Sequence, residues 1–588
     1  MARFCVCLAP RTGHPDGRTG AAGEHLARMD AAAVAPGLAL VPDEPGPADG
    51  PFEAHGMRAV GEVTLHNRAD LLAALTADGA PAPPGCPDGE VLLRCWARLG
   101  APGIALAEGM FALAVLDGAG LVLIRDHVGA RTLFYARAVG TWAAASSLRA
   151  LRRWPALDTR MNLPAVRSFL TFAYLPGDET LLEGVREVLP GRVLRLAADG
   201  TATETVYWEP VERLDGERGP GADDRDVLTL RALLEQATAR RLPEAESVGV
   251  LLSGGIDSSL VTALAAKLHA HPVHTYSISF GDELPNELGY SGLVAAHCHT
   301  RHRVLTVSGT AVAARLADTA ALLDSPVGDP LTVPNLLLAE AVAGDGLRTV
   351  LNGEGGDPVF GGPKNLPMLV QEMHAGAPGA PWYEDRATAY LRSYRKCWTD
   401  LPELLTSEAL SALASAPAPE RFVAPYLTGP DRMGQLLNQL LHCNLRTKGA
   451  HHILTKVERL TASQGLEGRA PLFDRRVIDH AFAVPTALKL RGTAEKWVLK
   501  EAVRDLLPAT VVDRPKSGMR VPVQQWLRGP LRELAGDLLL GRAARRRGLF
   551  RPETVRTWMR GEGTLLPRQG GKLWLLLTLE LWLRAYDL

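Results

Sequence analysis

Apolar runs and helical stripes alternate along the second half of the chain. The run VGVLL (248–252) is typical of a strand buried on both faces, and a helical stripe of leucine and alanine (228–237) precedes it. A second helical pattern (260–269) follows the run, and RTVLN (348–352) is another short apolar run before a glycine-rich turn. This alternation predicts an α/β fold with a doubly wound parallel sheet and helices on both faces.

The first half has a different pattern. Apolar runs such as FALAVLD and LVLIRD are separated by Gly and Asp, which predicts strands joined by hairpins. Residues 210–226 are rich in Gly, Pro and charge and predict a linker. The expected domains are therefore residues 1–209 and 227–588. Within the second domain, a mostly helical segment with Pro-rich breaks, about 363–441, predicts a helical insert.

Composition narrows the class of protein. The 588 residues include 64 basic and 65 acidic side chains, so no excess of positive charge favours nucleic acid or an anionic membrane as a partner. Seven cysteines without a CxxC pair fit a reducing compartment. The amino terminus lacks the apolar run of a signal peptide, and charges interrupt the apolar carboxy-terminal segment. We expect a cytoplasmic protein that does not insert into membranes.

The segment SGGIDSS, directly after the 248–252 run, carries the most chemistry. Its two glycines allow a ligand to approach the backbone closely, and the free amides at the start of the next helix favour an anion. A carboxylate at Asp257 fits beside an anion only if a cation lies between them, and a pyrophosphate group with Mg²⁺ meets both demands. The predicted loop residues are Leu252, Ser253, Gly254, Gly255, Asp257, Ser258 and Ser259.

SGGIDSS resembles the pyrophosphate loop of the asparagine-synthetase-like ATP pyrophosphatases, which adenylate a carboxylate and pass it to an amine. Further motifs follow in the order of that family: LDSPVGDP, VLNGEGGDPVFGG, LTKVERL, LEGRAPLFDRRVIDHA, KLRGTAEKWVLKEAV and RPKSGMRVPVQQWLRG. These motifs cover most of the second half. The resemblance implies a PP-loop synthetase domain that uses ATP and Mg²⁺.

The resemblance also implies nucleotide and metal contacts. Asp257 and Asp357 match the two Mg²⁺ carboxylates, and because both follow short buried strands, a parallel sheet would bring them to one edge. Ser277 lies in YSISF (276–280), which resembles the strand whose backbone reads adenine. Gly353, in the motif NGEGGD, joins the expected nucleotide contacts.

Four residues are candidates for catalysis. Lys496 and Lys516 match two lysines that hold the leaving pyrophosphate and the reacting centre, where fixed cations stabilise negative charge. Glu354 and Glu458 are candidates near the acceptor amine, which must lose a proton before it attacks. The family usually has Asp at the position of Glu458. A structural salt bridge is the alternative interpretation of either glutamate.

The first half resembles the glutaminase domain of asparagine synthetase, an amino-terminal-nucleophile (Ntn) hydrolase with an αββα sandwich. The resemblance rests on MFALAVLD, LVLIRDHVGARTLFYAR and AAASSLRAL. That hydrolase needs Cys as the first residue of the mature chain. Here removal of the first methionine would expose Ala2, whereas Cys5 and Cys7 are internal and alternate with apolar residues as in a buried strand. Val60 replaces the Asn that precedes Gly-Glu. We expect a degenerate domain without glutamine hydrolysis.

Without glutaminase activity, the amine that attacks the activated carboxylate must have a source other than glutamine. The simplest source is the substrate itself, which gives ring closure, as in the β-lactam and carbapenam synthetases and in the lasso-peptide macrolactam cyclases. Glu354 stands where the β-lactam branch has Tyr, and FGGPKNLPML and AYLRSYRKCWTDLPELL resemble lasso cyclases. The helical insert also suits a peptide. These features favour the lasso cyclases.

The expected enzyme is an ATP-dependent, AMP-forming carbon–nitrogen ligase. It would adenylate an Asp or Glu side chain of a precursor peptide and close a macrolactam with the amino-terminal amine of the same peptide. The resemblance implies a leader peptidase and a leader-recognition protein as partners. The alternatives are a small-molecule lactam synthetase, an amidotransferase that uses another amine, and an inactive peptide-binding scaffold.

The motif HCHTRH (297–302) combines three histidines with a cysteine. The irregular spacing is not that of a metal site, and the segment predicts an ordinary helix–loop–strand connection.

Overall fold

The computed structural model describes residues 3–8, 32–35, 37–41, 46–213, 219–281, 287–362, 368–369, 385–394, 396–515, 518–561 and 569–588. The chain forms two compact units. The first unit comprises Met1–Asn162, Gly177–Glu209 and Val457–Gly465, and the second comprises Leu163–Pro176, Pro210–Lys456 and Leu466–Leu588. Both units contain helices and strands, so the chain is a mixed α/β protein, as its patterns predict.

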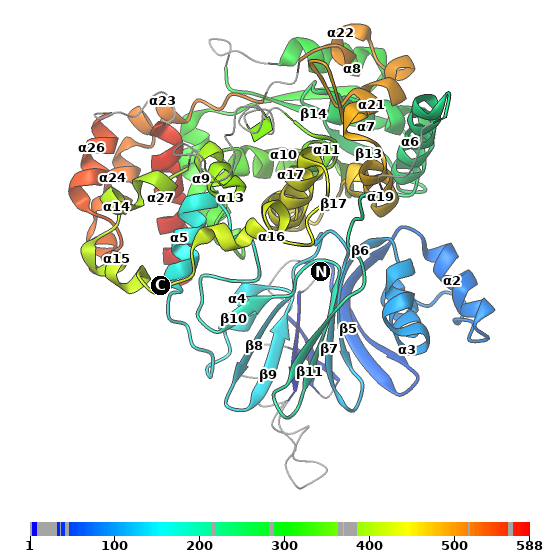
Figure 1. Ribbon diagram of the computed structural model, residues 1–588, viewed down its shortest axis with the longest axis horizontal. Coiled ribbons are helices and arrows are strands. Elements are labelled where there is room, and N and C mark those ends of the chain that lie inside the picture. The colour runs from blue at the N-terminus through cyan, green and yellow to red at the C-terminus, as the bar shows by residue number, and fades with distance from the viewer. Residues whose placement is uncertain are drawn as a thin grey trace. The chain divides into compact units, whose positions relative to one another are not determined.

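The first unit contains two six-stranded antiparallel sheets (Figure 1). One sheet has the order β10-β8-β9-β1-β3-β2 and the other the order β12-β11-β7-β6-β5-β4. The strands of the first sheet are β1 (Arg3–Leu8), β2 (Ala32–Ala35), β3 (Leu38–Val41), β8 (Phe134–Ala138), β9 (Thr141–Ala145) and β10 (Val185–Glu187). Those of the second are β4 (Asp49–Ala54), β5 (Met57–Leu65), β6 (Gly109–Leu116), β7 (Gly120–Arg125), β11 (Arg192–Ala197) and β12 (Ala202–Val206).

Strand β6 shows how these sheets pack. Phe111 and Leu113 belong to a buried cluster with residues of helices α2 (Arg68–Ala77) and α3 (Asp88–Leu106), whereas Ala112 belongs to a cluster with β1 and β3 of the other sheet. Because successive side chains of a strand point to opposite faces, the sheets pack face to face and the two helices cover the outer face of the second sheet. The short helix α4 (Leu148–Arg152) contacts the first sheet.

A five-stranded sheet forms the centre of the second unit. Its order is β15-β14-β13-β16-β17, and all neighbouring strands are parallel. The strands are β13 (Val248–Leu251), β14 (Val273–Ser279), β15 (Arg301–Thr306), β16 (Thr349–Leu351) and β17 (Glu467–Arg469). The chain proceeds from β13 outward to β15 and then returns to β16 on the other side of β13. The strand order therefore reverses between β13 and β16, the point where open α/β sheets bind ligands.

Helices surround this sheet (Figure 1). The helices before the insert are α5 (Leu163–Phe172), α6 (Ala222–Ala239), α7 (Ile256–Leu268), α8 (Leu288–His297), α9 (Gly309–Leu322), α10 (Thr332–Gly344) and α11 (Gly356–Phe360). The described part of the predicted insert contains α13 (Arg386–Tyr394), α14 (Leu401–Leu404), α15 (Ser407–Leu413), α16 (Ala424–Leu427) and the start of α17 (Leu436–Asn444), with 3₁₀ turns at Trp398–Asp400 and Pro419–Phe422. It is therefore largely helical.

The remaining elements follow the insert. A π-helical segment (Leu445–Leu454) continues directly into α18 (Thr455–Ala462). The later helices are α19 (Arg475–Ala483), α20 (Thr486–Lys489), α21 (Trp497–Ala502), α22 (Ala509–Val512), α23 (Val523–Arg528), α24 (Arg532–Leu540), α25 (Arg542–Arg547), α26 (Pro552–Arg560) and α27 (Gln569–Ala585). Further short elements are the hairpin β18 (Leu490–Arg491) and β19 (Ala494–Glu495) and the 3₁₀ turns Pro471–Phe473 and Arg504–Leu506.

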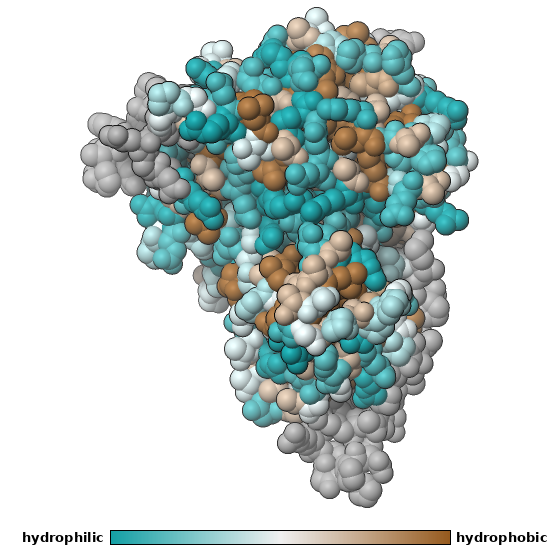
Figure 2. Space-filling model, turned by 90° about the vertical axis from the view of Figure 1, so that its right-hand side faces the viewer, coloured by the Kyte–Doolittle hydropathy of each residue, from teal (hydrophilic) through white to brown (hydrophobic). Residues whose placement is uncertain are grey.

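The apolar carboxy-terminal segment is part of a core. Trp574 and Leu577 of α27 are fully buried in one cluster with Val312 of α9, Val342 of α10 and Val350 of β16. None of the helices in the described ranges combines the length and apolar character needed to cross a bilayer. On the face shown in Figure 2, apolar side chains form separate patches among hydrophilic ones.

The structure corrects the predicted linker. Helix α6 begins at Ala222, inside the segment 210–226, so the last residues of that segment are helical. Gly221 precedes the helix with a left-handed backbone, and Asp223 and Asp224 occupy its first turn, where negative charge is favourable. The acidic residues and the glycine that predict a linker here instead form the start of a helix.

Two segments lie in a different unit from the one expected. Residues Leu163–Pro176 belong to the second unit, although the predicted first domain runs to residue 209. Conversely, Val457–Gly465 belong to the first unit, although the predicted second domain runs from 227 to 588 without interruption. Both segments are amphipathic helices or their flanks, whose packing partners are far away in the sequence.

Candidate active site

Two loops meet at the point where the strand order reverses. Val250 of β13 is paired with Leu351 of β16, so the two strands end side by side. A Cβ atom on Gly353 would lie 2.4 Å from the Ser258 backbone nitrogen, and one on Gly356 would lie 2.1 Å from Asp257 Oδ1. Only glycine at these positions lets the loop after β16 pack against the first turn of α7.

The loop after β13 is held by its own hydroxyl groups. Ser258 Oγ accepts a hydrogen bond from the Ser253 backbone nitrogen at 3.1 Å, donates to the Gly255 carbonyl at 3.2 Å, and lies 3.0 Å from Ser253 Oγ. Gly254 has a φ of +79°, and a Cβ atom there would lie 2.7 Å from the Ser291 nitrogen. The structure thus has the predicted sharp turn before α7, a geometry that suits an anion at the amides of the helix start.

Two other predicted nucleotide residues flank this loop. Ser277 Oγ donates to the Leu252 carbonyl at 2.5 Å, which ties β14 to the end of β13. Ser259 is fully buried, and its hydroxyl has no hydrogen-bond partner within the part of the chain that the structure describes. Ser277 therefore lies beside the loop, whereas Ser259 lies in the core.

Three charged side chains converge beside the loop, and we refer to them as the carboxylate–lysine triad: Asp257, Asp357 and Lys496. Lys496 Nζ lies 2.8 Å from Asp257 Oδ1, 2.7 Å from Asp257 Oδ2 and 2.6 Å from Asp357 Oδ1. The side chains of Lys496 and Asp257 are 1% and 9% exposed, whereas that of Asp357 is 42% exposed. The structure thus brings together the two predicted metal carboxylates and one predicted catalytic lysine.

The triad comes from three helix starts. Asp257 and Asp357 lie in the first turns of α7 and α11, which favours their negative charge, and Lys496 is the residue before α21. The backbone of Lys496 is left-handed, with a φ of 56°, a conformation that side chains other than glycine adopt at an energetic cost. This conformation is present where the chain turns from the β18–β19 hairpin into α21.

Two pockets border the loop. The first is lined by Leu252, Ser253, Ser277, Ile278, Phe280, Glu287, Leu288, Ser291, Met519 and Arg520. The second is lined by Gly255, Ile256, Glu495, Lys496, Lys500, Val511, Arg514 and Pro515. The first combines apolar walls with hydroxyl groups, as a nucleoside requires, and the second contains three cationic side chains, as phosphate requires.

Arg514 is a site residue that the sequence analysis missed. Its Nη1 donates to the Gly254 carbonyl at 3.2 Å, it forms an ion pair with Glu287, and its guanidinium lies 4.0 Å from the ring centroid of Tyr290. These contacts fasten the Gly254 turn to the start of α8. The signal available in the sequence was the position of Arg514 two residues before the predicted Lys516.

The remaining catalytic candidates have different positions. Lys516 lies outside the described residues. Glu354 is half-buried in the loop after β16, and its backbone nitrogen donates to Asn352 Oδ1 at 3.0 Å. Asn352 also donates to the Arg469 carbonyl at 3.2 Å. Asn352 therefore fixes the backbone on which Glu354 lies, a role not seen in the sequence.

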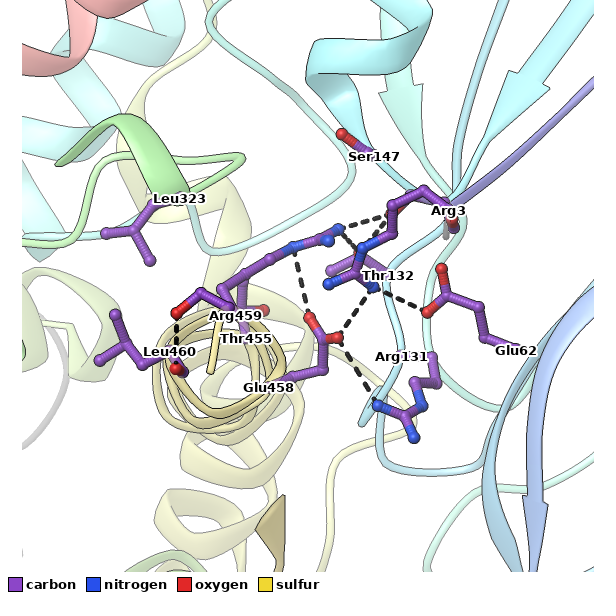
Figure 3. Close-up of polar contacts among 12 residues, drawn as sticks. Arg3, Glu62, Arg131, Thr132, Ser147, Leu323, Thr455, Glu458, Arg459 and Leu460 are labelled. Atoms are coloured by element: carbon purple, nitrogen blue, oxygen red, sulfur yellow. Dashed lines mark hydrogen bonds and ion pairs between the residues drawn. The ribbon is translucent and has the colours of Figure 1, made fainter. Parts of the chain in front are cut away.

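Glu458 belongs to a buried cluster of the first unit (Figure 3), the arginine–glutamate cluster: Arg3, Glu62, Arg131, Glu458 and Arg459. Arg3 Nη1 lies 2.8 Å from Glu62 Oε2 and 2.8 Å from Glu458 Oε1. Glu458 also lies 3.6 Å from Arg131 and 3.3 Å from Arg459. Burial raises the pKa of Glu458, but Arg3, Arg459 and Arg131 outweigh this and lower it to about 2. Such a carboxylate is a weak base.

The cysteines of the first unit are not arranged as nucleophiles. Cys5 and Cys7 are 0% and 1% exposed in the middle of β1, which pairs with β3 on one side and β9 on the other. Burial raises the pKa of Cys7 to about 12. A thiol buried in this way is poorly placed to form the thiolate that a nucleophile requires. Val60 is fully buried in β5.

The HCHTRH segment has the predicted helix–loop–strand structure. Helix α8 ends at His297 and β15 begins at Arg301. His302 Nδ1 lies 2.9 Å from Thr275 Oγ1, and His297 Nε2 lies 3.2 Å from the Leu506 carbonyl. Within the described ranges, no three or more His, Cys, Asp or Glu side chains form a group able to hold a metal ion.

Asp257 and Asp357 nevertheless suit a metal that arrives with phosphate. Mg²⁺ usually binds one or two protein carboxylates and completes its shell with water and substrate phosphates. Because oxygens of both carboxylates converge on one atom, Lys496 Nζ, they are placed to hold one small cation. Such an ion would neutralise phosphate charge and polarise the phosphorus centre.

Both halves of the chain are similar to known proteins. Residues 229–584 match the family model described as asparagine synthase, and residues 49–208 match that described as a glutamine amidotransferase domain. A putative glutamine-hydrolysing asparagine synthetase of Mycobacterium tuberculosis is 30% identical over 491 residues, covering 77% of this chain and 72% of the relative. Asparagine synthetase 1 of Bacillus subtilis is 24% identical over 478 residues, covering 77% and 74%. The carboxyethyl-arginine beta-lactam-synthase of Streptomyces clavuligerus is 30% identical over 465 residues, covering 77% and 72%.

Proposed function

The chain belongs to the asparagine synthase family, and we propose that it is an ATP-dependent ligase that joins an activated carboxylate to an amine from a source other than glutamine. One observation carries the proposal. The second unit has the complete carboxylate–lysine triad beside a phosphate-binding loop, whereas both cysteines near the start of the first unit are internal and buried. This contrast supports a ligase that activates a carboxylate but takes its amine from a source other than glutamine.

The reaction has two steps. A carboxylate oxygen of the substrate attacks the α-phosphorus of ATP, the bond to the β-phosphate oxygen breaks, and pyrophosphate leaves. The amine nitrogen then attacks the carbonyl carbon of the acyl-adenylate, loses a proton, and AMP leaves. The amides at the start of α7 bind phosphate oxygens, and Lys496 stabilises the charge on the leaving pyrophosphate. Mg²⁺ bound by Asp257 and Asp357 would neutralise further phosphate charge.

Glu354 is the better candidate for the base that takes the amine proton. It lies on the same loop as Asp357, held by Asn352, and is half-buried. Glu458 has a pKa lowered to about 2 by three arginines after the opposing effect of burial, so it binds a proton too weakly for this role. We assign general-base catalysis to Glu354 and a structural role to Glu458.

We further propose that the carboxylate and amine belong to one precursor peptide, so that the product is a macrolactam of the lasso-peptide type. Helix α11, which begins beside Asp357, packs against α17 of the insert and against the π-helical segment. Phe172, Tyr174, Tyr390 and Leu440 join α5, α13 and α17 in one core. The insert therefore packs against the helix at the end of the loop after β16, which carries Glu354 and Asp357. This contact supports a substrate larger than an amino acid.

The peptide proposal implies other components. A free amino-terminal amine must be released from the precursor, so a leader peptidase and a leader-recognition protein are the proposed partners. We place the reaction in the cytoplasm, where precursor peptides and ATP are available.

A small-molecule lactam synthetase is the second candidate. The similarity to the beta-lactam-synthase of Streptomyces clavuligerus favours it, since its identity to this chain, 30%, equals that of the putative asparagine synthetase of Mycobacterium tuberculosis. Glu354 favours the peptide, because the β-lactam branch has Tyr at this position.

One assay separates the candidates. The protein is incubated with ATP, Mg²⁺ and either core peptides carrying Asp or Glu or small β-amino acids, and AMP and product mass are measured. The proposal predicts AMP and a peptide lighter by one water. AMP with β-amino acids alone would favour the small-molecule lactam synthetase, and no AMP with any substrate would favour an inactive scaffold.

A further inference from the structure

Lys496 lies where a cation bound by the two carboxylates would lie. Its ammonium contacts both oxygens of Asp257 and one oxygen of Asp357, all within 2.8 Å. A metal ion coordinated by the same two carboxylates would require the same oxygens. The ammonium and a metal ion cannot occupy this position at the same time.

The contact has a clear electrostatic reason. Two carboxylates that approach one point repel each other, and burial strengthens the repulsion because little water screens it. The side chain of Asp257 is 9% exposed and that of Lys496 is 1% exposed. The ammonium therefore stabilises the two carboxylates in their converging arrangement.

The backbone supports a specific role for this lysine. Lys496 has a φ of 56°, in the left-handed region that favours glycine, yet a lysine is present and its side chain is buried. The buried charge of Lys496 and its two carboxylate partners, on such a backbone, support a specific role for this side chain. Surface lysines such as Lys267, which is 46% exposed beside Glu235, have no comparable constraint.

The second pocket offers the ammonium another partner. Lys496 lines this pocket together with Lys500 and Arg514, a cationic environment that suits phosphate. Once phosphate groups enter, the ammonium can pair with them and release oxygens of Asp257 and Asp357. The same phosphates supply the additional ligands that a Mg²⁺ ion needs.

We propose that Lys496 holds the metal position in the nucleotide-free protein, so that the divalent ion binds together with the nucleotide and not before it. This inference rests on the proposed function because it takes Asp257 and Asp357 as metal ligands. In this proposal, Lys496 pairs first with the two carboxylates and then with phosphate. The order of binding follows from this exchange.

The test measures metal binding without catalysis. Mn²⁺ is titrated by electron paramagnetic resonance into the full-length protein, with and without an ATP analogue in which a methylene bridges the α- and β-phosphorus atoms. We expect the analogue to tighten Mn²⁺ binding to the protein site by about tenfold or more, a common size for coupling between sites. Binding of Mn²⁺ to the free protein as tight as in the presence of the analogue would overturn the proposal.

Two variants test the role of the Lys496 charge in Mn²⁺ binding. Lys496→Met keeps the length of the side chain without its charge, and we expect the nucleotide-free variant to bind Mn²⁺ about tenfold more tightly than the wild type. The double variant Asp257→Asn with Lys496→Met should lose this gain. Lys456→Met is the matched control, because Lys456 is also buried and paired with a carboxylate, Asp329, at 2.5 Å. It should not change Mn²⁺ binding.

The outcomes separate this inference from the proposed function. If Lys496→Met gains no affinity for Mn²⁺, the role of the lysine is wrong, whatever the activity. If the variant cannot be purified as a folded protein, the wild-type titrations with and without the analogue decide. Substrate-dependent AMP formation by the wild type is measured separately. AMP formation together with nucleotide-independent Mn²⁺ binding would leave the ligase proposal standing and remove this inference.

Discussion

The molecule contains two groups of paired acidic and basic side chains, one in each unit, and they differ in their surroundings. In the arginine–glutamate cluster of the first unit, three guanidinium groups surround two carboxylates, and the contacts link separate elements of the unit. In the carboxylate–lysine triad of the second unit, two carboxylates share one ammonium beside the loop after β13 and two pockets. Paired buried charge alone therefore does not identify an active site.

Access is the physical difference between the two groups. All five members of the arginine–glutamate cluster are at most 5% exposed. In the triad, Asp357 is 42% exposed, and Lys496 lines a pocket. Glycines also bring backbone within contact distance of Asp257, a close approach that suits ligand binding. This difference in access supports the proposed roles, which are structural for the arginine–glutamate cluster and catalytic for the triad.

The largest expected effect is at the triad. Replacing Asp257 by Asn should lower AMP formation by about 10³-fold, because one charge that organises the lysine and the cation is lost. The melting temperature should change little. Asp345→Asn is the control, since Asp345 pairs with Tyr276 of β14 and Arg303 of β15 and not with Lys496, and it should leave turnover unchanged. An Asp257→Asn protein with wild-type turnover would refute the assignment.

The opposite behaviour is expected in the arginine–glutamate cluster. Glu458→Gln should destabilise the first unit by about 3 kcal/mol, because removing one partner leaves buried guanidinium groups unpaired. AMP formation measured below the melting temperature should remain. Loss of AMP formation with an unchanged melting temperature would instead show that Glu458 acts in catalysis.

The same residue gives a pH dependence of stability. The pKa of Glu458 is lowered from 4.5 to about 2 in the folded protein, by arginines that outweigh the effect of burial. Its stabilising contribution is therefore present above pH 4.5 and is lost as the pH falls towards 2. Denaturant unfolding of the wild type should weaken more steeply over this range than that of Glu458→Gln. Parallel curves would contradict the ion pairing.

A smaller effect is expected where Arg514 supports the loop. Arg514→Gln removes the donor to Gly254 and the pair with Glu287, so KM for ATP should rise about tenfold with little change in kcat. Arg514→Lys should restore part of the affinity. Arg504→Gln, which removes a more exposed ion pair with Glu501, is the control. A fall in kcat alone would assign Arg514 to the chemical step.

The smallest effect is expected at the cysteines of the first unit. Cys7→Ala should leave turnover unchanged, and the folded wild type should resist alkylation at Cys7 because burial raises its pKa to about 12. Mass spectrometry after iodoacetamide treatment measures this directly. Rapid labelling of Cys7 with loss of a glutamine-dependent activity would contradict the loss of glutaminase function.

The sequence predicts local structure well where periodicity is strong. The run 248–252 and the following SGGIDSS predict a strand, a turn and a helix, and the structure has β13, the Gly254 turn and α7. The start of α6 at Ala222 was missed because acidic residues and glycine also occur in linkers. The placement of Leu163–Pro176 and Val457–Gly465 depends on packing with distant parts of the chain, which periodicity does not report.

The site was predicted as a set of residues, not as an arrangement. Asp257, Asp357 and Lys496 were all identified, but their contact with one another depends on the register of β13 and β16 and on the left-handed turn at Lys496. Glu458 was expected near the acceptor amine because of its motif. Its contact with Arg3 joins opposite ends of the sequence, so no local pattern could reveal it.

The central claim is that the second unit activates a carboxylate while the first unit hydrolyses no glutamine. The most direct measurement supplies ATP, Mg²⁺, glutamine labelled with ¹⁵N in its amide, and short peptides with a free amino terminus and an Asp or Glu side chain. We predict AMP, a peptide product lighter by one water without ¹⁵N, and no glutamate. Release of glutamate with ¹⁵N in the product would contradict the account.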